Sequence, residues 1–347
     1  MKNVLVLGGT GFVGAHVCEK LIRAGLRVTV PTRRAVNARN ILHLPALTVL
    51  ECDVHDEASL TQAMQGIDAV VNLVAILHGS PAAFDRVHRA LPEKIARACA
   101  AQGVRQLVHI SALGTDHQQP QACVSNYLRS KGEGEAALMR ILGWPQDKAP
   151  ANANANATDA LAATPHTGLT VLRPSVIFGA QDQFLNVFAK LQKWFPVMPL
   201  AGADAKFHPV WVEDVAQAVV QSVVAGLSGA PRWQVFELVG TKVYRLRELV
   251  QLAARLSGLG GGHGRPVIGL PRWMGKVQAA MLGLMPGKPL MSADNLDSMQ
   301  VDNVATSQYP GLQAFGITPT ALAAIAPLYL VRDPAEKGLL GIRHRPH

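Results

Sequence analysis

Three side chains near the middle of the chain could together move a proton to or from a carbonyl group. Tyr127 and Lys131 are four residues apart, a spacing that places both on one face of a helix. A nearby ammonium favours the phenolate, so we expect Lys131 to bring the pKa of Tyr127 down from about 10 towards neutrality. Ser111 ends an apolar run and could polarise the carbonyl while Tyr127 transfers the proton. Alone, a Tyr-x-x-x-Lys pair is also typical of an ordinary helix surface.

The amino terminus carries a pattern that suits the hydride carrier such a reaction needs. An apolar run at 4–7 is followed by Gly-Gly-Thr-Gly-Phe-Val-Gly at 8–14, which fits GxxGxxG or GxGxxG. One glycine permits the tight turn, one lets the main chain approach a diphosphate, and Gly14 lets helix and strand pack closely. The amides and the positive dipole end of the helix then face the phosphates. The expected cofactor-binding residues of this turn are Gly8, Thr10, Gly11, Phe12, Val13 and Gly14.

The end of the second expected strand indicates which dinucleotide is bound. An NAD site usually places Asp or Glu there for the ribose 2′-hydroxyl, whereas this chain has Arg33 and Arg34. A guanidinium can bind a 2′-phosphate by paired, charge-assisted hydrogen bonds; two solvated arginines are the alternative. Asp53 and Val54 follow the third expected strand and are placed to meet the adenine, although Asp53 could equally form a turn or cap. We therefore expect NADP(H), with NAD(H) as the alternative.

Strands and helices alternate along the chain and must position these residues. Short apolar runs typical of buried strands lie at 4–7, 27–32, 47–51, 69–74, 106–111, 169–174 and 234–238. Apolar residues at helical spacing lie at 12–24, 57–65, 82–102, 126–142, 183–194 and 212–225. The alternation predicts βαβ units and hence an α/β fold with a doubly wound parallel sheet of the Rossmann type. Ser111 would then lie at the carboxyl edge of the sheet, where ligands bind.

The remaining sequence predicts the domain organisation. Residues 1–174 and 209–240 are expected to form the nucleotide-binding domain, interrupted at 145–167 by an Ala/Asn/Pro-rich insertion that we expect to be disordered. Residues 175–208 and 241–330 are expected to form a smaller, mainly helical substrate part with a short extended piece at 267–270. Residues 331–347 are expected to be a tail.

Composition excludes several classes of function. The 347 residues are 49% hydrophobic, which suffices for a large core. The formal charge is +9, but no Lys/Arg-rich run is interleaved with aromatic residues, so we expect no nucleic acid partner. The four cysteines and twelve histidines show no ligand spacing, so no metal is expected. Without a secretory signal or an apolar run of roughly 20 residues, a cytoplasmic protein with reduced thiols is expected.

Together these residues resemble the extended and atypical branches of the short-chain dehydrogenase/reductase superfamily, which include the NAD-dependent epimerases and dehydratases. The resemblance also covers 72–75, 172–179 and 208–216. It implies that Val74, Ala75, Pro174 and Val176 line the cofactor and that Lys131 holds the nicotinamide ribose. Asp214 is expected mainly to cap a helix. The chain departs from the pattern at Leu7, where threonine is common, and after Ser111, where Ala-Leu-Gly-Thr replaces Val-Tyr-Gly.

Within this superfamily the chain looks most like bacterial relatives of the nucleotide-binding accessory subunit of mitochondrial complex I. The similarity rests on 127–131, on Phe-His-Pro-Val at 207–210 and on the segments 289–296 and 302–303. This resemblance implies tightly bound NADPH. It also implies a role in structure rather than turnover, which weighs against catalysis by Tyr127.

Two classes of function therefore remain open. One is an NADP(H)-dependent oxidoreductase linked to respiratory or quinone metabolism, with a small-molecule or quinone-like substrate, or a nucleotide-sugar epimerase or dehydratase. The other is a catalytically silent NADPH-binding subunit of a complex I-like assembly; a nucleotide sensor would not need the Tyr/Lys pair. An amphipathic stretch at 273–284 flanked by basic residues favours peripheral association with the inner membrane or a respiratory complex, although packing on the substrate part is the favoured role for its apolar face.

Overall fold

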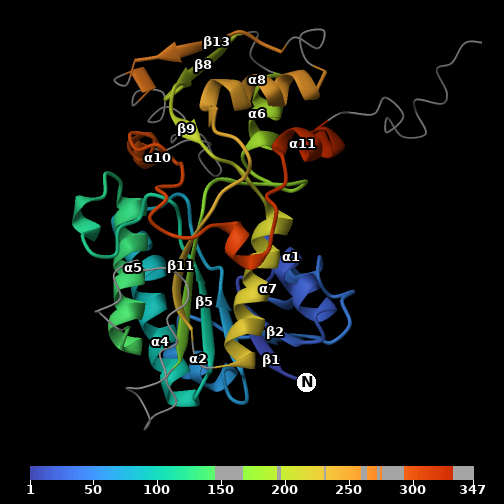
Figure 1. The fold of residues 1–347 in the computed structure, drawn as a ribbon, viewed down its shortest axis with the longest axis vertical. Coiled ribbons are helices and arrows are strands. Elements are labelled where there is room, and N and C mark those ends of the chain that lie inside the picture. The colour runs from blue at the N-terminus through green and yellow to red at the C-terminus, as the bar shows by residue number, and fades with distance from the viewer. Residues whose placement is uncertain are drawn as a thin grey trace, which may run out of the picture.

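A seven-stranded parallel sheet forms the centre of the protein (Figure 1). The computed structural model describes residues 1–144, 167–193, 197–229, 232–258, 264–271, 274–275 and 293–330. The strands are β1 (Asn3–Leu7), β2 (Arg27–Thr32), β3 (Leu47–Glu51), β4 (Ala69–Asn72), β5 (Gln106–Ile110), β6 (Gly168–Pro174) and β11 (Trp233–Leu238). Their order is β11-β6-β5-β4-β1-β2-β3, so the chain reverses its winding at β1 and β4. The predicted doubly wound sheet is confirmed.

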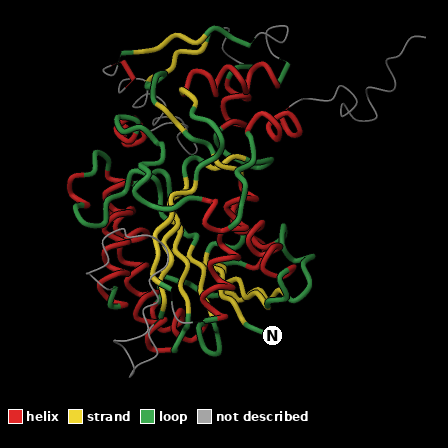
Figure 2. Tube along the Cα trace, in the orientation of Figure 1, coloured by secondary structure: helices red, strands yellow, loops and turns green. Residues whose placement is uncertain are grey.

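Helices cover both faces of the sheet because its strands are apolar on both sides. Val4 and Val6 of β1 face one core, while Leu5 and Leu7 face the other. Helices α1 (Phe12–Arg23) and α7 (Val212–Ser228) cover the first face, and α2 (Glu57–Ala63), α4 (Leu91–Gln102) and α5 (Asn126–Leu142) cover the second. Figure 2 shows the strands running between these two helical layers. The carboxyl ends of the strands therefore share one edge.

The helix predicted at 82–102 is instead three segments. It consists of α3 (Pro81–Phe84), a π-helical segment η2 (Asp85–Ala90) and α4. Pro92 explains the break, because proline cannot donate to the carbonyl of His88 and its ring would clash with that carbonyl in a regular α-helix. A wider turn accommodates this. The carbonyl of His88 packs instead against Gly134 of α5, where a Cβ atom would lie only 1.9 Å from the oxygen.

The other element boundaries coincide with the predictions or differ from them by one to three residues. Strand β4 ends at Asn72 rather than at residue 74, because the Asn72 side chain accepts a hydrogen bond from Val74 N and turns the chain out of the sheet. Strand β5 ends at Ile110, one residue before Ser111. Helix α7 continues to Ser228, three residues beyond its expected end.

A third apolar core lies beyond the carboxyl edge of the sheet. It is built from α6 (Leu185–Leu191), α8 (Leu246–Leu256) and α11 (Leu322–Leu330) with short strand pairs. The pairs are β7 (Ile177–Phe178) with β10 (Val210–Trp211), β8 (Met198–Ala201) with β13 (Val267–Leu270), and β9 (Lys206–Phe207) with β12 (Tyr244–Arg245). Only β13 was predicted; β7, β9, β10 and β12 have two residues each, too few to show a periodicity. The described part also contains α10 (Ala293–Ser298), η1 (Ala35–Ala38), η3 (Pro120–Ala122) and η5 (Leu312–Phe315).

Several predictions fall outside the described residues. These are the insertion at 145–167 apart from Thr167, the tail at 331–347 and most of the amphipathic stretch at 273–284. In the part of the chain that is described, no helix has the length and apolar character needed to cross a bilayer.

Candidate functional site

The glycine turn folds tightly between β1 and α1. Gly8 has φ +82°, a conformation that glycine adopts without strain. A Cβ at Gly14 would lie 2.3 Å from Gly8 O and 2.6 Å from Gly9 Cα, so only glycine lets α1 pack this closely on the turn. On its other side Gly8 contacts the main chain of Leu73 after β4. The turn therefore lies at the sheet's reversal of winding, where ligands bind in doubly wound folds.

The first turn of α1 presents main-chain amides without a side-chain cap. Its N-cap residue is Gly11, and Phe12, Val13 and Gly14 follow with no acidic residue among them. The amides and dipole of a 12-residue helix therefore favour an anion at this point. Thr10 and Gly11 complete the turn, and Thr10 O accepts a hydrogen bond from the Asn40 amide at 3.3 Å. A diphosphate fits the chemistry of this loop.

The two arginines predicted to select NADP(H) are exposed after β2. Within the described residues, neither Arg33 nor Arg34 forms an ion pair with a carboxylate. Both guanidinium groups are thus available to an anionic ligand. Sequence reasoning missed Glu51 on β3, which pairs with Thr32 in the sheet and accepts a hydrogen bond from Ala35 N. A carboxylate therefore also lies at this end of β2, which only the strand register reveals.

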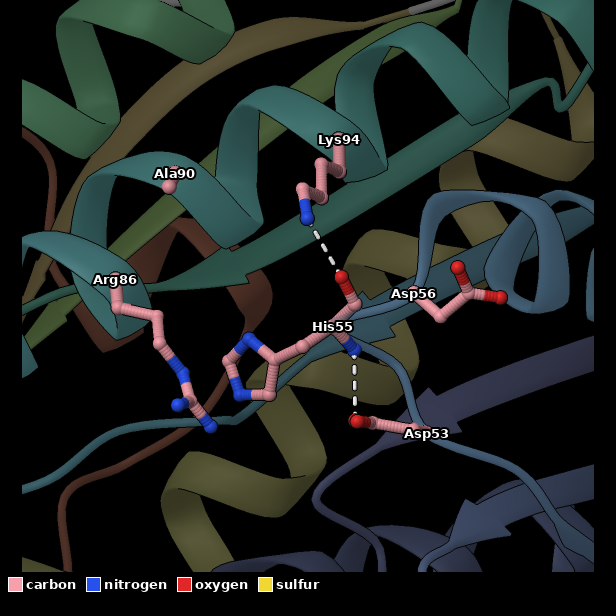
Figure 3. Close-up of a pocket in the computed structure, with 6 residues that line it drawn as sticks. All are labelled: Asp53, His55, Asp56, Arg86, Ala90 and Lys94. Atoms are coloured by element: carbon pink, nitrogen blue, oxygen red, sulfur yellow. Dashed lines mark hydrogen bonds between the residues drawn. The ribbon is translucent and has the colours of Figure 1, made fainter.

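A cavity of about 440 Å³ opens beside Asp53 (Figure 3). It is lined by Asp53, His55, Asp56, Arg86, Ala90 and Lys94. The two aspartates are engaged by local main chain: Asp53 Oδ1 accepts a bond from His55 N at 3.0 Å, and Asp56 caps α2 by accepting from Ser59 N at 2.9 Å. This volume lies in the range of small-molecule sites.

Acidic and basic groups both line this cavity. Figure 3 shows the His55 ring beside the Arg86 guanidinium, with Lys94 reaching the main-chain oxygen of His55. Partial burial lowers the pKa of His55, and the charges of Arg86, Lys94 and Arg33 lower it further, against the opposing effect of Asp53. Of these residues, only Asp53 and Arg33 were predicted, because Arg86 and Lys94 come from the segments η2 and α4 on the far side of the cavity.

Lys131 is anchored to the sheet. Its side chain is 2% exposed, and Nζ donates a 2.8 Å hydrogen bond to the main-chain oxygen of Ile110 at the end of β5. Burial lowers the pKa of Lys131 to about 8, although Glu135 one turn further along α5 opposes the shift. Lys131 therefore still carries its proton predominantly at neutral pH.

Tyr127 is half-buried on the same face of α5, between Phe84 and His88. Its ring meets those of Phe84 and His88 edge-on, with centroid distances of 6.2 Å and 5.4 Å. Burial raises the pKa of Tyr127 to about 12. This is opposite to the expected lowering by Lys131, because removal of the phenol from water is the cause of the shift. Tyr127 is consequently a phenol at neutral pH and could donate a proton.

Ser111 is buried directly after the end of β5. The buried Ser111 hydroxyl has no well-formed hydrogen bond, but it lies near the Glu135 carboxylate and helps to lower its pKa. The serine thus faces a buried charge network, and its catalytic role stays a prediction.

That network is an ion pair between α5 and β6. Arg173 donates to Glu135 through Nε at 3.1 Å and through Nη2, and Thr115 donates to the same carboxylate at 2.8 Å. Burial would raise the pKa of Glu135, but the charge and hydrogen bonds of Arg173 outweigh it and lower the pKa to about 2. His117 and the ring of Tyr309 complete the contacts of the guanidinium. The ion pair between Glu135 and Arg173 therefore holds α5 against the sheet.

Sequence reasoning also missed His88, which links the loop after β4 to α5. His88 Nε2 accepts a 3.1 Å hydrogen bond from Ile76 N, so the ring proton is on Nδ1, which lies 2.9 Å from Ser130 Oγ. Ser130 in turn donates to Tyr127 O at 2.9 Å. Burial, together with the charge of Lys131, lowers the pKa of His88 to about 2. A neutral imidazole thus connects the expected cofactor loop to Tyr127. His88 lies in the π-helical segment η2, and such segments are often found at functional sites.

The remaining predicted cofactor residues lie at the carboxyl edge of the sheet. Val74 and Ala75 follow β4 next to Leu73, which packs on Gly8. Pro174 ends β6, with its oxygen accepting from Leu113 N at 3.1 Å, and Val176 O accepts from Val210 N at 3.0 Å. Among the described residues, no group of three or more His, Cys, Asp or Glu side chains is arranged to hold a metal ion.

Comparison with known proteins agrees with this geometry. Residues 4–137 match the NAD dependent epimerase/dehydratase family. The chain is 30% identical over 332 residues to NADH dehydrogenase [ubiquinone] 1 alpha subcomplex subunit 9, mitochondrial, of Mus musculus, covering 91% of this chain and 76% of the relative. It is 25% identical to the NADH-ubiquinone oxidoreductase 40 kDa subunit of Neurospora crassa, with 94% and 78% covered.

The fold is also shared with solved structures. An NADPH-dependent quinone oxidoreductase from Escherichia coli, solved with NADPH, superposes with a TM-score of 0.66 at 20% identity, covering 94% of this chain and 99% of that one. At this identity the likeness shows the fold alone. The match to the mouse subunit carries the assignment: the chain belongs to the family of the alpha subcomplex subunit 9 proteins, within the extended short-chain dehydrogenases/reductases.

Proposed function

We propose that the protein binds NADP(H) at the carboxyl edge of its sheet and uses it to reduce a carbonyl or quinone-like substrate. The observation that supports this most directly is the tight glycine turn in front of the uncapped first turn of α1. Gly8, Gly11 and Gly14 would let the main chain approach the diphosphate. Arg33 and Arg34 would hold the 2′-phosphate. The cavity beside Asp53 would take the adenine end.

The protonation states favour the reductive direction. The bound dinucleotide would supply hydride. Tyr127 is protonated at neutral pH because burial raises its pKa to about 12, so it would donate a proton to the substrate oxygen. Lys131, held by Ile110 O, would keep its ammonium close to the ribose side of the site. Ser111 would contribute only if its hydroxyl turned away from Glu135.

A second candidate function is a redox-silent, NADPH-binding accessory subunit associated with a respiratory complex at the membrane. The observation that favours it is the raised pKa of Tyr127, to which Lys131 makes no compensating contribution. A phenol with so high a pKa is a weak acid for catalysis, since the best catalytic pKa lies near the operating pH. The subunits named for the mouse and Neurospora relatives belong to such complexes.

One set of measurements separates the candidates. We expect calorimetry to detect NADPH binding to the wild-type chain, with NADH weaker. We then expect oxidation of NADPH in the presence of ubiquinone-1, a water-soluble quinone, to be lost in Tyr127→Phe while NADPH affinity is retained. If NADPH binds but neither this quinone nor other carbonyl probes are reduced, the accessory role is supported. If neither dinucleotide binds, both candidates fail.

A further inference from the structure

The helix that carries Tyr127 and Lys131 begins without an acidic residue of its own. Its first turn is Asn126, Tyr127 and Leu128, and the N-cap residue Ser125 satisfies only Leu128 N, at 3.1 Å. The main-chain amides of Asn126 and Tyr127 therefore need hydrogen-bond acceptors from other parts of the chain. A carboxylate is the group that best suits such a position, because it accepts both amides and complements the helix dipole.

The C-terminal part of the chain supplies this carboxylate. Asp294 Oδ1 accepts from Asn126 N at 2.7 Å, and Asp294 Oδ2 accepts from Tyr127 N at 3.0 Å. A second contact joins the same elements, because Ser298 Oγ lies 2.8 Å from Ser125 Oγ. Figure 1 shows α10, which contains both Asp294 and Ser298, next to α5. A segment about 168 residues further along the chain thus completes the start of α5.

We propose that Asp294 is a positioning residue: it ties the C-terminal part to the first turn of α5, so that the placement of Tyr127 depends on how the C-terminal part is seated. Lys131 is fixed by the sheet through Ile110 O, whereas the main-chain amide of Tyr127 is fixed by Asp294. The two members of the pair therefore depend on different parts of the molecule. Displacement of α10 would loosen Tyr127 while Lys131 stayed in place.

The consequence for reactivity rests on the proposed function, whereas the anchor itself does not. A substrate bound against the C-terminal part would contact the same part that holds Tyr127. Its binding would then be coupled to the position of the proton donor. This link would contribute to substrate specificity. Only a ligand that leaves α10 in place would find the Tyr127 phenol in its correct position.

Hydrogen exchange measured by mass spectrometry tests the anchor directly. In Asp294→Ala we expect the amides of Asn126 and Tyr127 to exchange about 5- to 30-fold faster than in the wild type, as for the loss of a helix cap. Asp294→Asn keeps one acceptor oxygen and should lie between the two. Asp302→Asn is the matched control, since it removes the same charge from an exposed residue that pairs with Lys206.

A second readout follows the tyrosine itself. The chain has four tyrosines, and the difference from Tyr127→Phe identifies the signal of Tyr127 in ¹³Cζ-tyrosine NMR. Between about pH 8 and about pH 11, we expect Tyr127 to begin ionising in Asp294→Ala but not in the wild type or Asp302→Asn, because a loosened first turn exposes the phenol. General destabilisation would not single out this ring.

The outcomes distinguish the two proposals. Exchange at 126–127 that is unchanged in Asp294→Ala would overturn the anchor, whatever the protein binds. Faster exchange in a protein that binds no dinucleotide would support the anchor and refute the proposed function. If exchange increases but the Tyr127 resonance titrates as in the wild type, the role of Asp294 is to cap the helix and not to position Tyr127.

Discussion

His88 Nδ1 lies 2.9 Å from Ser130 Oγ, which itself donates to the main-chain oxygen of Tyr127. The imidazole is 1% exposed and its other nitrogen accepts from Ile76 N. His109 is buried nearby, and its Nδ1 lies 3.0 Å from Asn72 Nδ2. Both histidines are held neutral, because burial lowers the pKa of His88 to about 2 and that of His109 to about 3.

The two buried histidines predict acid sensitivity. Their folded-state pKa values lie below the unfolded value of about 6.5, so the unfolded chain binds more protons as the pH falls below that value. Their contribution to stability is complete above about pH 6.5 and decreases at lower pH by about 1.4 kcal/mol per pH unit for each histidine. Urea unfolding at several pH values between about pH 4 and about pH 7 measures this slope.

Comparing variants of single histidines shows which residue causes this pH dependence of the free energy of unfolding. His88→Gln should remove about half of it while keeping a donor and an acceptor for Ser130 and Ile76. His43→Gln, at an exposed position, should leave the slope unchanged. Equal slopes in the wild type and His88→Gln would contradict the neutral state assigned to His88.

The arginines after β2 predict a selective loss of NADPH affinity. In the double variant Arg33→Ala/Arg34→Ala, we expect NADPH to bind about 10- to 100-fold more weakly, the scale of one lost charge-assisted hydrogen bond, while NADH binding changes little. Fluorescence titration with both dinucleotides measures the ratio. Arg27→Ala, at the opposite end of β2, is the control. A parallel loss for NADH and NADPH would show that the arginines do not contact the 2′-phosphate.

Gly14→Ala should damage the dinucleotide site through the main chain. The new Cβ would lie 2.3 Å from Gly8 O, so α1 must move away from the turn. We expect NADPH affinity to fall at least about tenfold, equivalent to about 1.4 kcal/mol. Gly229→Ala adds the same methyl group at a helix end with no atom within 4 Å and should bind like the wild type. Retained affinity in Gly14→Ala would argue against the glycine turn as the diphosphate site.

Removing one partner of the ion pair between Glu135 and Arg173 should strongly lower the free energy of unfolding. Arg173→Met leaves a buried carboxylate unpaired and should destabilise the protein by about 3–5 kcal/mol. The double variant Glu135→Gln/Arg173→Met removes both charges and should recover part of that loss in urea unfolding. Asp302→Asn breaks an exposed ion pair with Lys206 and should lower the free energy of unfolding by no more than about 1 kcal/mol. Equal losses at both pairs would show that Glu135 is hydrated.

Local sequence patterns determined the scaffold. The seven sheet strands could be predicted because each is a short apolar run, and central strands such as β1 have residues buried on both faces. The glycine turn was recognisable because its conformation depends on residue type over a few positions. Tyr127 and Lys131 were predicted on one face of a helix, since a spacing of four residues fixes that relationship wherever the helix lies.

Contacts between distant segments were decided only by the tertiary structure. The cavity joins Asp53 to Arg86, the neutral His88 depends on a π-helical segment that Pro92 imposes, and Asp294 completes the start of α5. Burial likewise reversed the expected direction of the pKa shift of Tyr127. The physical reason is common to all of these. A hydrogen bond or a desolvation effect depends on atoms about 3 Å away, and periodicity along the chain does not reveal which residues of other segments supply them.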